Sequence, residues 1–328
     1  MSVLVRSAGF LTTVQDLGRV GLRQIGVSTS GALDWHAMRV ANALVKNEEG
    51  AAGLEITLGR LRLQFEDDRM VAWCGGAFDV QISEQNLSAG HTGFISAGAE
   101  LTMTAPKGGA RAWLAISGGI AVDFVLNSRS TDLHGGFGGL EGRTLRDGDR
   151  LQLGRSDLGP ASLVKIFGQG KVANWTARPS WVTTKSDRHF LRIIRGDHWS
   201  RFPGNAQSAL VERPFAVTSE SNRMAVRLDG PSLERNDLRD LVSEAVAPGT
   251  IQVPPSGQPI LLLGDCQTIG GYPRIGHVIT VDLSIAAQLW PGDELRFHEI
   301  TLAEAQELLR VREEEFQRFR TGVGLQLQ

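Results

Sequence analysis

Short apolar runs, rather than long helical stripes, dominate the hydrophobic pattern of this chain. From Leu54 to Ile116 the runs recur about every ten residues between polar, glycine-containing turns, which is the spacing of a β-sandwich or barrel. The strands expected in this region are 55–58, 61–65, 70–73, 78–82, 92–95, 100–104 and 111–116. With 39 glycines and little helical periodicity elsewhere, the pattern predicts a mainly β (β-rich α+β) fold with a few short helices.

Two segments do show helical periodicity. Residues 34–45 carry an apolar stripe, Asp34 is placed to cap the first turn, and Asn47 is expected to end the helix. Near the C-terminus, a Thr-x-x-Glu capping box predicts a polar-faced helix over 302–319. We expect this last helix to be a cover or a partner surface.

The length of 328 residues suggests two domains. Residues 156–188 mix Gly, Pro, Ser and charged residues and are expected to be a linker or cover segment between modules 1–155 and 189–328. The halves also resemble each other in outline: an apolar run leads to Gly118-Gly119 in the first and to Gly270-Gly271 in the second, offset by 270 − 118 = 152 residues. This offset predicts two related modules, although chance agreement in a glycine-rich chain is the simpler alternative.

The charge balance, the cysteine count and the absence of several motifs argue against certain classes of partner and catalytic site. The 34 basic and 36 acidic residues give a formal charge of −2 without long runs of either sign, which argues against nucleic-acid and membrane partners. Two cysteines and no long apolar run are typical of a cytoplasmic protein. The sequence contains no Walker-type phosphate loop, no Gly-x-Ser-x-Gly, and no His or Cys spacing of a metal site.

The glycine-rich stretch 264–276 is the strongest candidate for a functional loop. It lies between apolar runs 259–263 and 277–283, which are expected to be buried strands, and it contains the only tyrosine of the chain. The polar side chains that such a loop can display at fixed positions are Asp265, Gln267, Thr268 and Tyr272. The alternative is an ordinary glycine-rich turn.

Other polar turns offer carboxylates and donors next to glycines. They contain Gln15, Asp16, Arg19, Ser30, Asp34, residues 127–132, Arg223 and Arg227. Arginine is suited to bidentate capture of a carboxylate or phosphate, and Asp or Gln can orient an amide or a water. For any one of these turns, capping or turn formation is the simpler role. The glycine cluster 135–139 could form an anion-binding nest, a lid or a plain turn.

Several long motifs, in a fixed order, resemble a known family. They are residues 12–19 (TTVQDLGR), 30–34 (SGALD), 41–45 (ANALV), 54–58 (LEITL), 130–133 (STDL), 138–143 (GGLEGR), 222–224 (NRM) and 265–276 (DCQTIGGYPRIG). The chain is similar to the C subunit of prokaryotic ATP-dependent 5-oxoprolinase, a family also called allophanate hydrolase subunit 2 or biotin-dependent carboxyltransferase, which includes KipA. One departure is Ala225, where the family usually has glycine after Arg-Met.

The resemblance implies two cyclophilin-like β-barrel modules and partner proteins. In this family the C subunit works with two partners, a KipI-like B subunit plus an A subunit, to cleave 5-oxo-L-proline to L-glutamate with ATP hydrolysis. It therefore implies a small amide or lactam substrate and an ATP site at or near the interface with the B subunit. Two alternatives stay open: a urea carboxylase or allophanate-type carboxyltransferase component, which would require biotin, and a KipA-like regulator that binds a kinase inhibitor.

The same resemblance points to site residues. The residues expected to be catalytic are Asp265, Gln267, Thr268, Tyr272 and Asp16, with the two aspartates as general base or water-orienting groups and the others as amide ligands. The residues expected to bind substrate or phosphate are Gln15, Arg19, Ser30, Asp34, Arg223, Arg227, Gly270, Gly271 and Arg274. No metal ligand is expected.

Overall fold

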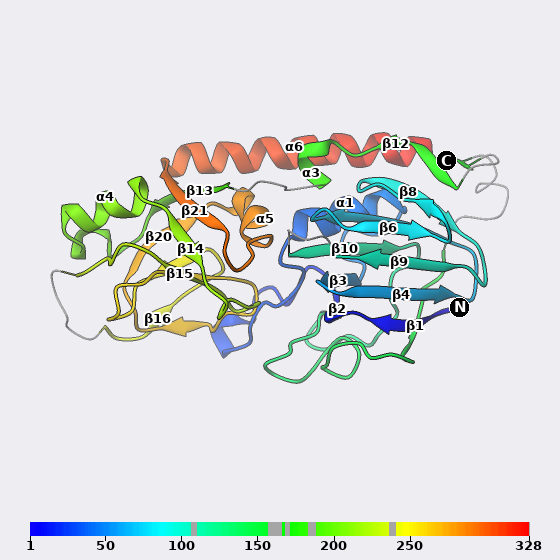
Figure 1. The fold of residues 1–328 in the computed structure, drawn as a ribbon, viewed down its shortest axis with the longest axis horizontal. Coiled ribbons are helices and arrows are strands. Elements are labelled where there is room, and N and C mark those ends of the chain that lie inside the picture. Colours follow the sequence, from blue (N-terminus) through cyan, green and yellow to red (C-terminus); the bar gives the residue numbers. More distant parts are fainter. Residues whose placement is uncertain (106–109, 157–165, 168–170, 183–187, 236–240, 328) are drawn as a thin grey trace. The chain divides into compact units, whose positions relative to one another are not determined.

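The structure is a computed structural model, and it describes residues 1–327 except 106–109, 157–165, 168–170, 183–187 and 236–240 (Figure 1). The chain divides into two compact units that are interleaved along the sequence. Unit 1 comprises Met1–Arg19, Ser30–Lys185 and Glu314–Gln328, and unit 2 comprises Val20–Thr29 and Ser186–Glu313.

Unit 1 contains two six-stranded sheets, in the orders β11-β1-β4-β9-β6-β7 and β12-β8-β5-β10-β3-β2. Its elements are β1 (Ser2–Ala8), β2 (Leu11–Gln15), α1 (Trp35–Leu44), β3 (Gly53–Thr57), β4 (Arg60–Phe65), β5 (Arg69–Gly75), β6 (Asp79–Ile82), β7 (Gln85–Asn86), β8 (His91–Ile95), β9 (Glu100–Thr104), β10 (Arg111–Ile116), β11 (Arg150–Gln152), β12 (Val172–Thr176) and α3 (Pro179–Val182). The apolar side chains of both sheets form one core cluster that includes Val3, Phe65 and Leu114.

The strand sequences explain how each sheet is covered. Strand β4 alternates between buried and less buried residues, as expected for a strand with one face in the core. Strands β5 and β10 are buried along their whole length, and helix α1 contacts both of them. Helix α1 therefore covers the second face of the β5–β10 region, which is why these two strands read as continuous apolar runs.

Unit 2 is built on a closed seven-stranded barrel in the order β13-β20-β17-β18-β15-β14-β21. Its elements are η1 (Arg23–Ile25), β13 (Arg188–Arg195), η2 (Trp199–Arg201), α4 (Gly204–Glu212), β14 (Phe215–Val217), β15 (Ala225–Asp229), β16 (Glu244–Ala245), β17 (Thr250–Gln252), β18 (Ile260–Leu262), β19 (Ile269–Gly270), β20 (Arg274–Val278), η3 (Thr280–Asp282), α5 (Leu283–Ala286), β21 (Glu294–Glu299) and α6 (Leu302–Gln326). Strands β16 and β19 form a separate two-stranded ribbon.

Helix α6 begins in unit 2 and ends in unit 1. Its capping box has the predicted form: the Thr301 backbone N–H donates to Glu304 Oε2 at 2.8 Å, and the Glu304 N–H donates to Thr301 Oγ1 at 3.2 Å. In its unit 1 portion, Phe316 is fully buried, and the Arg39 guanidinium lies 4.0 Å from the centre of its ring. The C-terminal portion of the helix is thus anchored in unit 1 by an aromatic contact.

The mainly β fold class, the few helices and the C-terminal helix are confirmed, although several local expectations are wrong. The run 277–283 is not a strand, because β20 starts at Arg274 and ends at Val278. The residue with left-handed backbone after α1 is Lys46, not Asn47. The linear division into 1–155, 156–188 and 189–328 stays a prediction about independent domains. The described part of 156–188 does, however, include β12, which pairs with β8, and α3, which contacts α1.

Candidate functional site

The predicted loop 264–276 lies between barrel strands β18 and β20 and is itself partly ordered as a ribbon. Gly270 pairs with Glu244, and Ile269 pairs with Ala245, in the β16–β19 ladder. A Cβ on Gly270 would lie 2.6 Å from Nε2 of Gln252, so a larger residue there would displace the Gln252 side chain. The loop is therefore held by pairing with β16 rather than being a free turn.

Asp265 and Arg223 meet inside unit 2. The Arg223 guanidinium donates to both carboxylate oxygens of Asp265, from Nε at 2.8 Å and from Nη2 at 3.1 Å, and the side chains of Arg223 and Asp265 are 6% and 4% exposed. The Asp265 backbone N–H also donates to the Arg223 carbonyl. The predicted general base and the predicted anion ligand thus neutralise each other in a buried bidentate ion pair.

The exposed part of the loop carries the remaining candidates. Gln267 is exposed, Tyr272 is 47% exposed, and Thr268 is half-buried. Gln252 ties this segment to β17, because its Nε2 donates to the Tyr272 carbonyl at 3.2 Å and its Oε1 accepts from Gln267 Nε2 at 3.5 Å. Gly271 lies between these side chains with no close backbone clash at its Cβ position. The loop can therefore present amide and phenol groups to a ligand.

Arg274 starts β20 in a cluster of charged groups. Its guanidinium forms ion pairs with Asp197, at 3.0 Å, and with Glu244, and donates to the Ala245 carbonyl at 2.8 Å. The Arg274 backbone N–H donates to Nδ1 of His198 at 3.2 Å. Burial, together with the charge of Arg274, lowers the pKa of His198. A neutral imidazole fits this geometry, since Nδ1 must act as an acceptor.

Arg227 stands apart from this arrangement. It occupies an exposed position of β15 and lies 3.5 Å from Glu220. Within the described residues no hydrogen bond or ion pair joins Arg227 to the loop 264–276. The two arginines predicted to bind substrate or phosphate therefore differ in environment, because the Arg223 side chain is buried and the Arg227 side chain is exposed.

In unit 1, Asp16 organises the turn 127–132. Its Oδ1 accepts from Ser128 Oγ at 2.7 Å, Ser130 Oγ at 2.5 Å and the Gly18 N–H at 2.8 Å, and its Oδ2 accepts from the Arg129 N–H at 2.6 Å. The side chain is buried. Four donors on one carboxylate are typical of a structural anion that fixes a loop.

The other first-unit candidates surround the same turn or the helix that follows it. Gln15 donates to the Thr131 carbonyl at 3.2 Å, and Arg19 donates to the Ser130 carbonyl at 2.5 Å while its guanidinium lies 4.7 Å from the ring centre of Phe137. Ser30 is buried with a left-handed φ of 51°. Asp34 accepts from the Ala37 N–H at 2.9 Å and so caps α1, as predicted. The turns containing Gln15, Asp16 and Arg19 are therefore brought together with 127–132, and Asp34 serves the helix.

Sequence reasoning missed Arg23. Its Nη2 donates to the Val246 carbonyl at 2.6 Å and to the Gln267 carbonyl at 2.7 Å, so η1 and the loop 264–276 are linked within unit 2. Arg23 lies 223 residues before Val246 and 244 residues before Gln267, and no local motif marks the contact. Gln252 was missed for the same reason, since it reads as an ordinary strand residue.

Neither cysteine has the environment of a nucleophile. Burial raises the pKa of Cys74 and of Cys266, and the nearby Arg23 only partly offsets the effect at Cys266. Among the described residues, no three His, Cys, Asp or Glu side chains are grouped so as to hold a metal ion. No helix in the described part of the chain has the length and apolar character needed to cross a bilayer.

Comparison with known proteins identifies the family to which this chain belongs. Residues 25–299 match the family model described as "Carboxyltransferase domain, subdomain A and B". The chain therefore belongs to the carboxyltransferase domain A and B family. It is 42% identical to the 5-oxoprolinase C subunit of Escherichia coli (strain K12) over 299 residues, covering 91% of both chains. It is 35% identical to the 5-oxoprolinase C subunit of Haemophilus influenzae over 306 residues, covering 92% of both.

A solved structure supports the same assignment. The crystal structure of the K. lactis urea amidolyase superposes with a TM-score of 0.87 and 28% identity over 97% of this chain, which corresponds to 20% of that larger protein. The resemblance inferred from the sequence motifs is confirmed.

Proposed function

We propose that this chain is the C subunit of a 5-oxoprolinase and, together with the A and B subunits, opens the lactam of 5-oxo-L-proline to L-glutamate with hydrolysis of ATP. The observation that carries the proposal is the 42% identity to a 5-oxoprolinase C subunit over 91% of both chains. Because the alignment covers 91% of both chains, it leaves no large region of this chain in which a different activity could reside.

The contacts within unit 2 divide the candidate residues by role. Gln267, Thr268 and Tyr272 are the accessible or half-buried polar groups of the loop, and they can hydrogen-bond a lactam carbonyl or N–H. Asp265 is buried against Arg223, so in this proposal it is a positioning residue that holds the base of the loop. In this proposal, the partner subunits supply the remaining catalytic groups. ATP binds at or near the interface with the B subunit.

The contacts of the first-unit candidates favour structural roles for several of them. All four hydrogen bonds to the Asp16 carboxylate come from its own unit, which leaves it poorly placed to act as a general base. We therefore propose that Asp16 and Asp34 shape the polar turns and that Gln15, Arg19 and Ser30 support them. Any contribution of these turns to ligand binding would come from the turn 127–132 that they position.

Reconstitution tests the proposal. The purified A and B subunits are mixed with this chain, 5-oxo-L-proline and ATP, and glutamate and ADP are measured against the same mixture without this chain. We expect equimolar glutamate and ADP only when this chain is present, and a loss of about tenfold or more in turnover with Tyr272→Phe or Gln267→Ala. The matched control is Phe190→Leu, at an exposed aromatic of β13 in the same unit. Glutamate formation unaffected by omission of this chain would contradict the proposal.

A second candidate function rests on the urea amidolyase superposition. In that reading the chain is part of a carboxyltransferase that moves a carboxyl group from carboxybiotin to urea. The same preparation, given urea and a carboxybiotin-bearing partner, would convert the partner's carboxybiotin to biotin and urea to allophanate, without consuming ATP in this step. A KipA-like regulator would instead form a stable complex with an inhibitor protein and show turnover in neither assay.

A further inference from the structure

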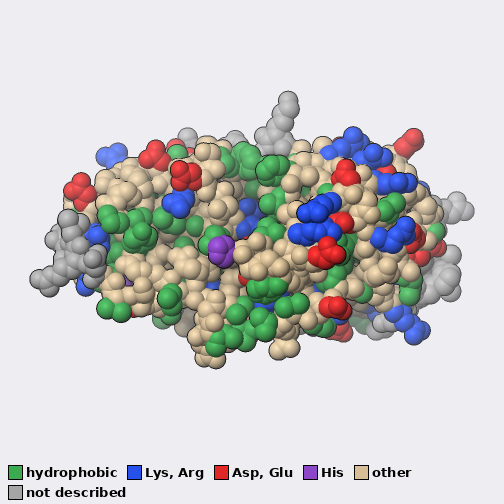
Figure 2. Space-filling model, turned by 90° about the horizontal axis from the view of Figure 1, so that it is seen from below, with side chains coloured by type: hydrophobic (Ala, Val, Ile, Leu, Met, Phe, Trp, Pro, Cys, Tyr) green, Lys and Arg blue, Asp and Glu red, His purple; other side chains and the backbone are tan. Residues whose placement is uncertain are grey.

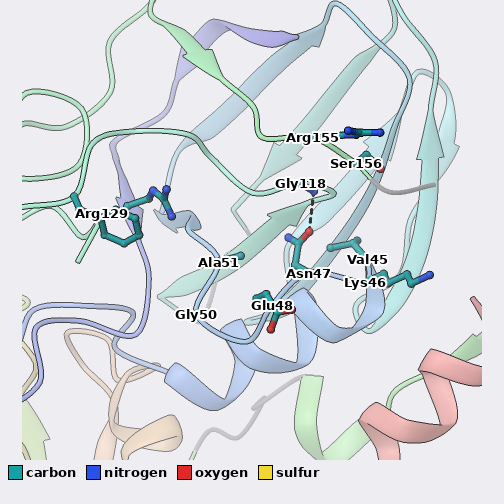
Figure 3. A pocket seen from close by; sticks show the side chains of 11 residues that line it. Val45, Lys46, Asn47, Glu48, Gly50, Ala51, Gly118, Arg129, Arg155 and Ser156 are labelled. Carbon is teal, nitrogen blue, oxygen red and sulfur yellow. Dashed lines mark hydrogen bonds between the residues drawn. The ribbon is translucent and has the colours of Figure 1, made fainter. Parts of the chain in front are cut away.

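Unit 1 contains a hollow of about 420 Å³ that is lined only by residues of that unit. It is lined by Val45, Lys46, Asn47, Glu48, Gly50, Ala51, Gly118, Phe124, Arg129, Arg155 and Ser156 (Figure 3). Its volume falls in the range of small-molecule sites in proteins. Three of its lining side chains are cationic, and one is acidic.

The floor of this hollow is rigid. Asn47 Oδ1 accepts from the Gly118 N–H at 2.8 Å, and its Nδ2 donates to the Ile116 carbonyl at 2.9 Å (Figure 3). Gly118 has φ +88°, and a Cβ there would lie 2.4 Å from the Gly154 carbonyl oxygen. The end of α1 and the turn after β10 are therefore locked together, which makes the hollow a formed site rather than a gap between loops.

The three cations have no acidic partner among the described residues. Arg155 and Lys46 form no side-chain hydrogen bond or ion pair there, and Arg129 donates from Nε to the Val122 carbonyl at 2.8 Å while its guanidinium lies 3.8 Å from the ring centre of Phe124. The one acidic lining residue, Glu48, is 93% exposed and lies 3.9 Å from Arg320. On the face shown in Figure 2, basic and acidic side chains lie next to one another. Within the described part of the chain, the hollow thus has three cationic side chains that are not paired with an acidic one.

The backbone is strained at or near two of these cations. Lys46 has a left-handed φ of 59° at the end of α1, a position that glycine or asparagine usually occupies. Leu126 and Asn127, in the turn that leads to Arg129, have φ values of 54° and 61°. A favourable interaction of the lysine charge with the C-terminal end of the α1 dipole would explain why a lysine occupies position 46. It does not account for Arg129 and Arg155, which come from other segments.

We propose that this hollow binds a small organic dianion, such as a dicarboxylate or a phosphorylated acid. In Figure 3, Arg129 lies on one side of the Asn47–Gly118 hydrogen bond, and Lys46 and Arg155 lie on the other. Cations on two sides of one hollow suit a ligand with two negative charges. The side chains of Ala51 and Phe124 supply apolar surface for the carbon chain between the charged ends. This site does not depend on the lactam-opening proposal.

Calorimetric titration of the full chain tests the site with glutarate as the dicarboxylate and inorganic phosphate as the phosphoryl group. Valerate, a monoanion of the same chain length, is the ligand control. We expect saturable binding of at least one dianion with Kd below about 10 mM, weakening as ionic strength rises, and binding of valerate about tenfold weaker. Binding of phosphate alone would assign the ligand to the phosphorylated class, and binding of glutarate alone would assign it to the dicarboxylates.

Variants place the binding in this hollow. Arg155→Gln and Lys46→Asn should each weaken dianion binding about tenfold, and asparagine also tolerates the left-handed backbone at residue 46. The matched control is Arg60→Gln, at an exposed arginine of β4 that does not line the hollow, and it should bind as the unaltered chain does. Absence of saturable binding of both dianions, or equal binding by Arg155→Gln and the unaltered chain, would overturn the proposal.

Discussion

Arg223 and Asp265 form a bidentate ion pair at 2.8 and 3.1 Å that is buried in unit 2. The pair joins the segment before β15 to the base of the loop 264–276. Removing one partner from such a pair leaves the other charge buried without that partner, which costs far more than the loss of an exposed ion pair.

The first prediction follows from this burial. Asp265→Asn should lower the free energy of unfolding by about 3–5 kcal/mol, measured by urea denaturation, because the Arg223 charge would remain buried. Arg223→Met combined with Asp265→Asn should recover part of this loss. Arg227→Gln is the control, since Arg227 is exposed, and it should change stability by no more than about 1 kcal/mol. If Asp265→Asn leaves stability unchanged but abolishes turnover, Asp265 is catalytic rather than positioning.

Asp16 gives a second prediction for unit 1. Asp16→Asn replaces one acceptor oxygen by an NH₂ group, so at least one of the donors from Ser128, Ser130, Gly18 and Arg129 loses its partner. We expect a loss of about 3 kcal/mol in the free energy of unfolding.

Asp123→Asn is the control for this second prediction, because Asp123 is exposed, and it should change stability by less than about 0.5 kcal/mol. Comparable midpoints for the two variants in urea would show that the Asp16 network contributes little to folding.

More of the fold than of the candidate site could be predicted from the sequence. The ten-residue rhythm of apolar runs marked strands such as β9 and β10 at their observed bounds, because each strand is a local pattern of burial. Helix capping is also a local sequence signal. The N-cap at Asp34 predicted the helix that begins at Trp35, and the capping box at Thr301 predicted the helix that begins at Leu302. The strand bounds were wrong where tertiary pairing sets them. Strand β20 begins at Arg274 because that residue pairs with Gln252 of β17, and its residues 276–278 also pair with β13.

The glycine doublets show the same limit. Gly118 and Gly119 both have positive φ in a turn that closes the hollow, whereas Gly270 belongs to strand β19 and has no positive φ. Similar dipeptides thus have different local structures, and the relation of the two halves stays a prediction. The burial of Asp265 against Arg223 was also invisible in the sequence, because the partners are 42 residues apart and no motif links them.

The cysteines give a third prediction. Burial raises the pKa of both thiols, so neither should form much thiolate near neutral pH in the folded chain. In the native protein at pH 8, we expect reaction with Ellman's reagent to be at least about a hundredfold slower than in denaturant, where both thiols are exposed. A Cys266→Ser variant separates the two sites. Rapid labelling of native Cys266 would mean that Arg23 activates the thiol instead of only partly offsetting its burial.

His198 gives the fourth prediction, a pH dependence. Burial and the charge of Arg274 lower the pKa of His198 in the folded chain, and its Nδ1 accepts from the Arg274 N–H. The unfolded chain therefore binds more protons than the folded one between the lowered pKa and the ordinary value of about 6.5. Stability from this group is complete above about pH 6.5 and is lost as pH falls toward the folded-state pKa.

The measurement for this last prediction is the free energy of unfolding at several pH values from about 7.5 to about 5. His198→Asn keeps an acceptor near Nδ1 but cannot titrate, so the fall in stability below about pH 6.5 should be shallower in the variant than in the unaltered chain. His277 also has a pKa lowered mainly by burial, so some slope should remain in the variant. The control, His134→Asn at an exposed histidine, should keep the full slope. Parallel pH profiles for His198→Asn and the unaltered chain would show that His198 has the same proton affinity in the folded and unfolded states, and the assigned direction of its pKa would be wrong.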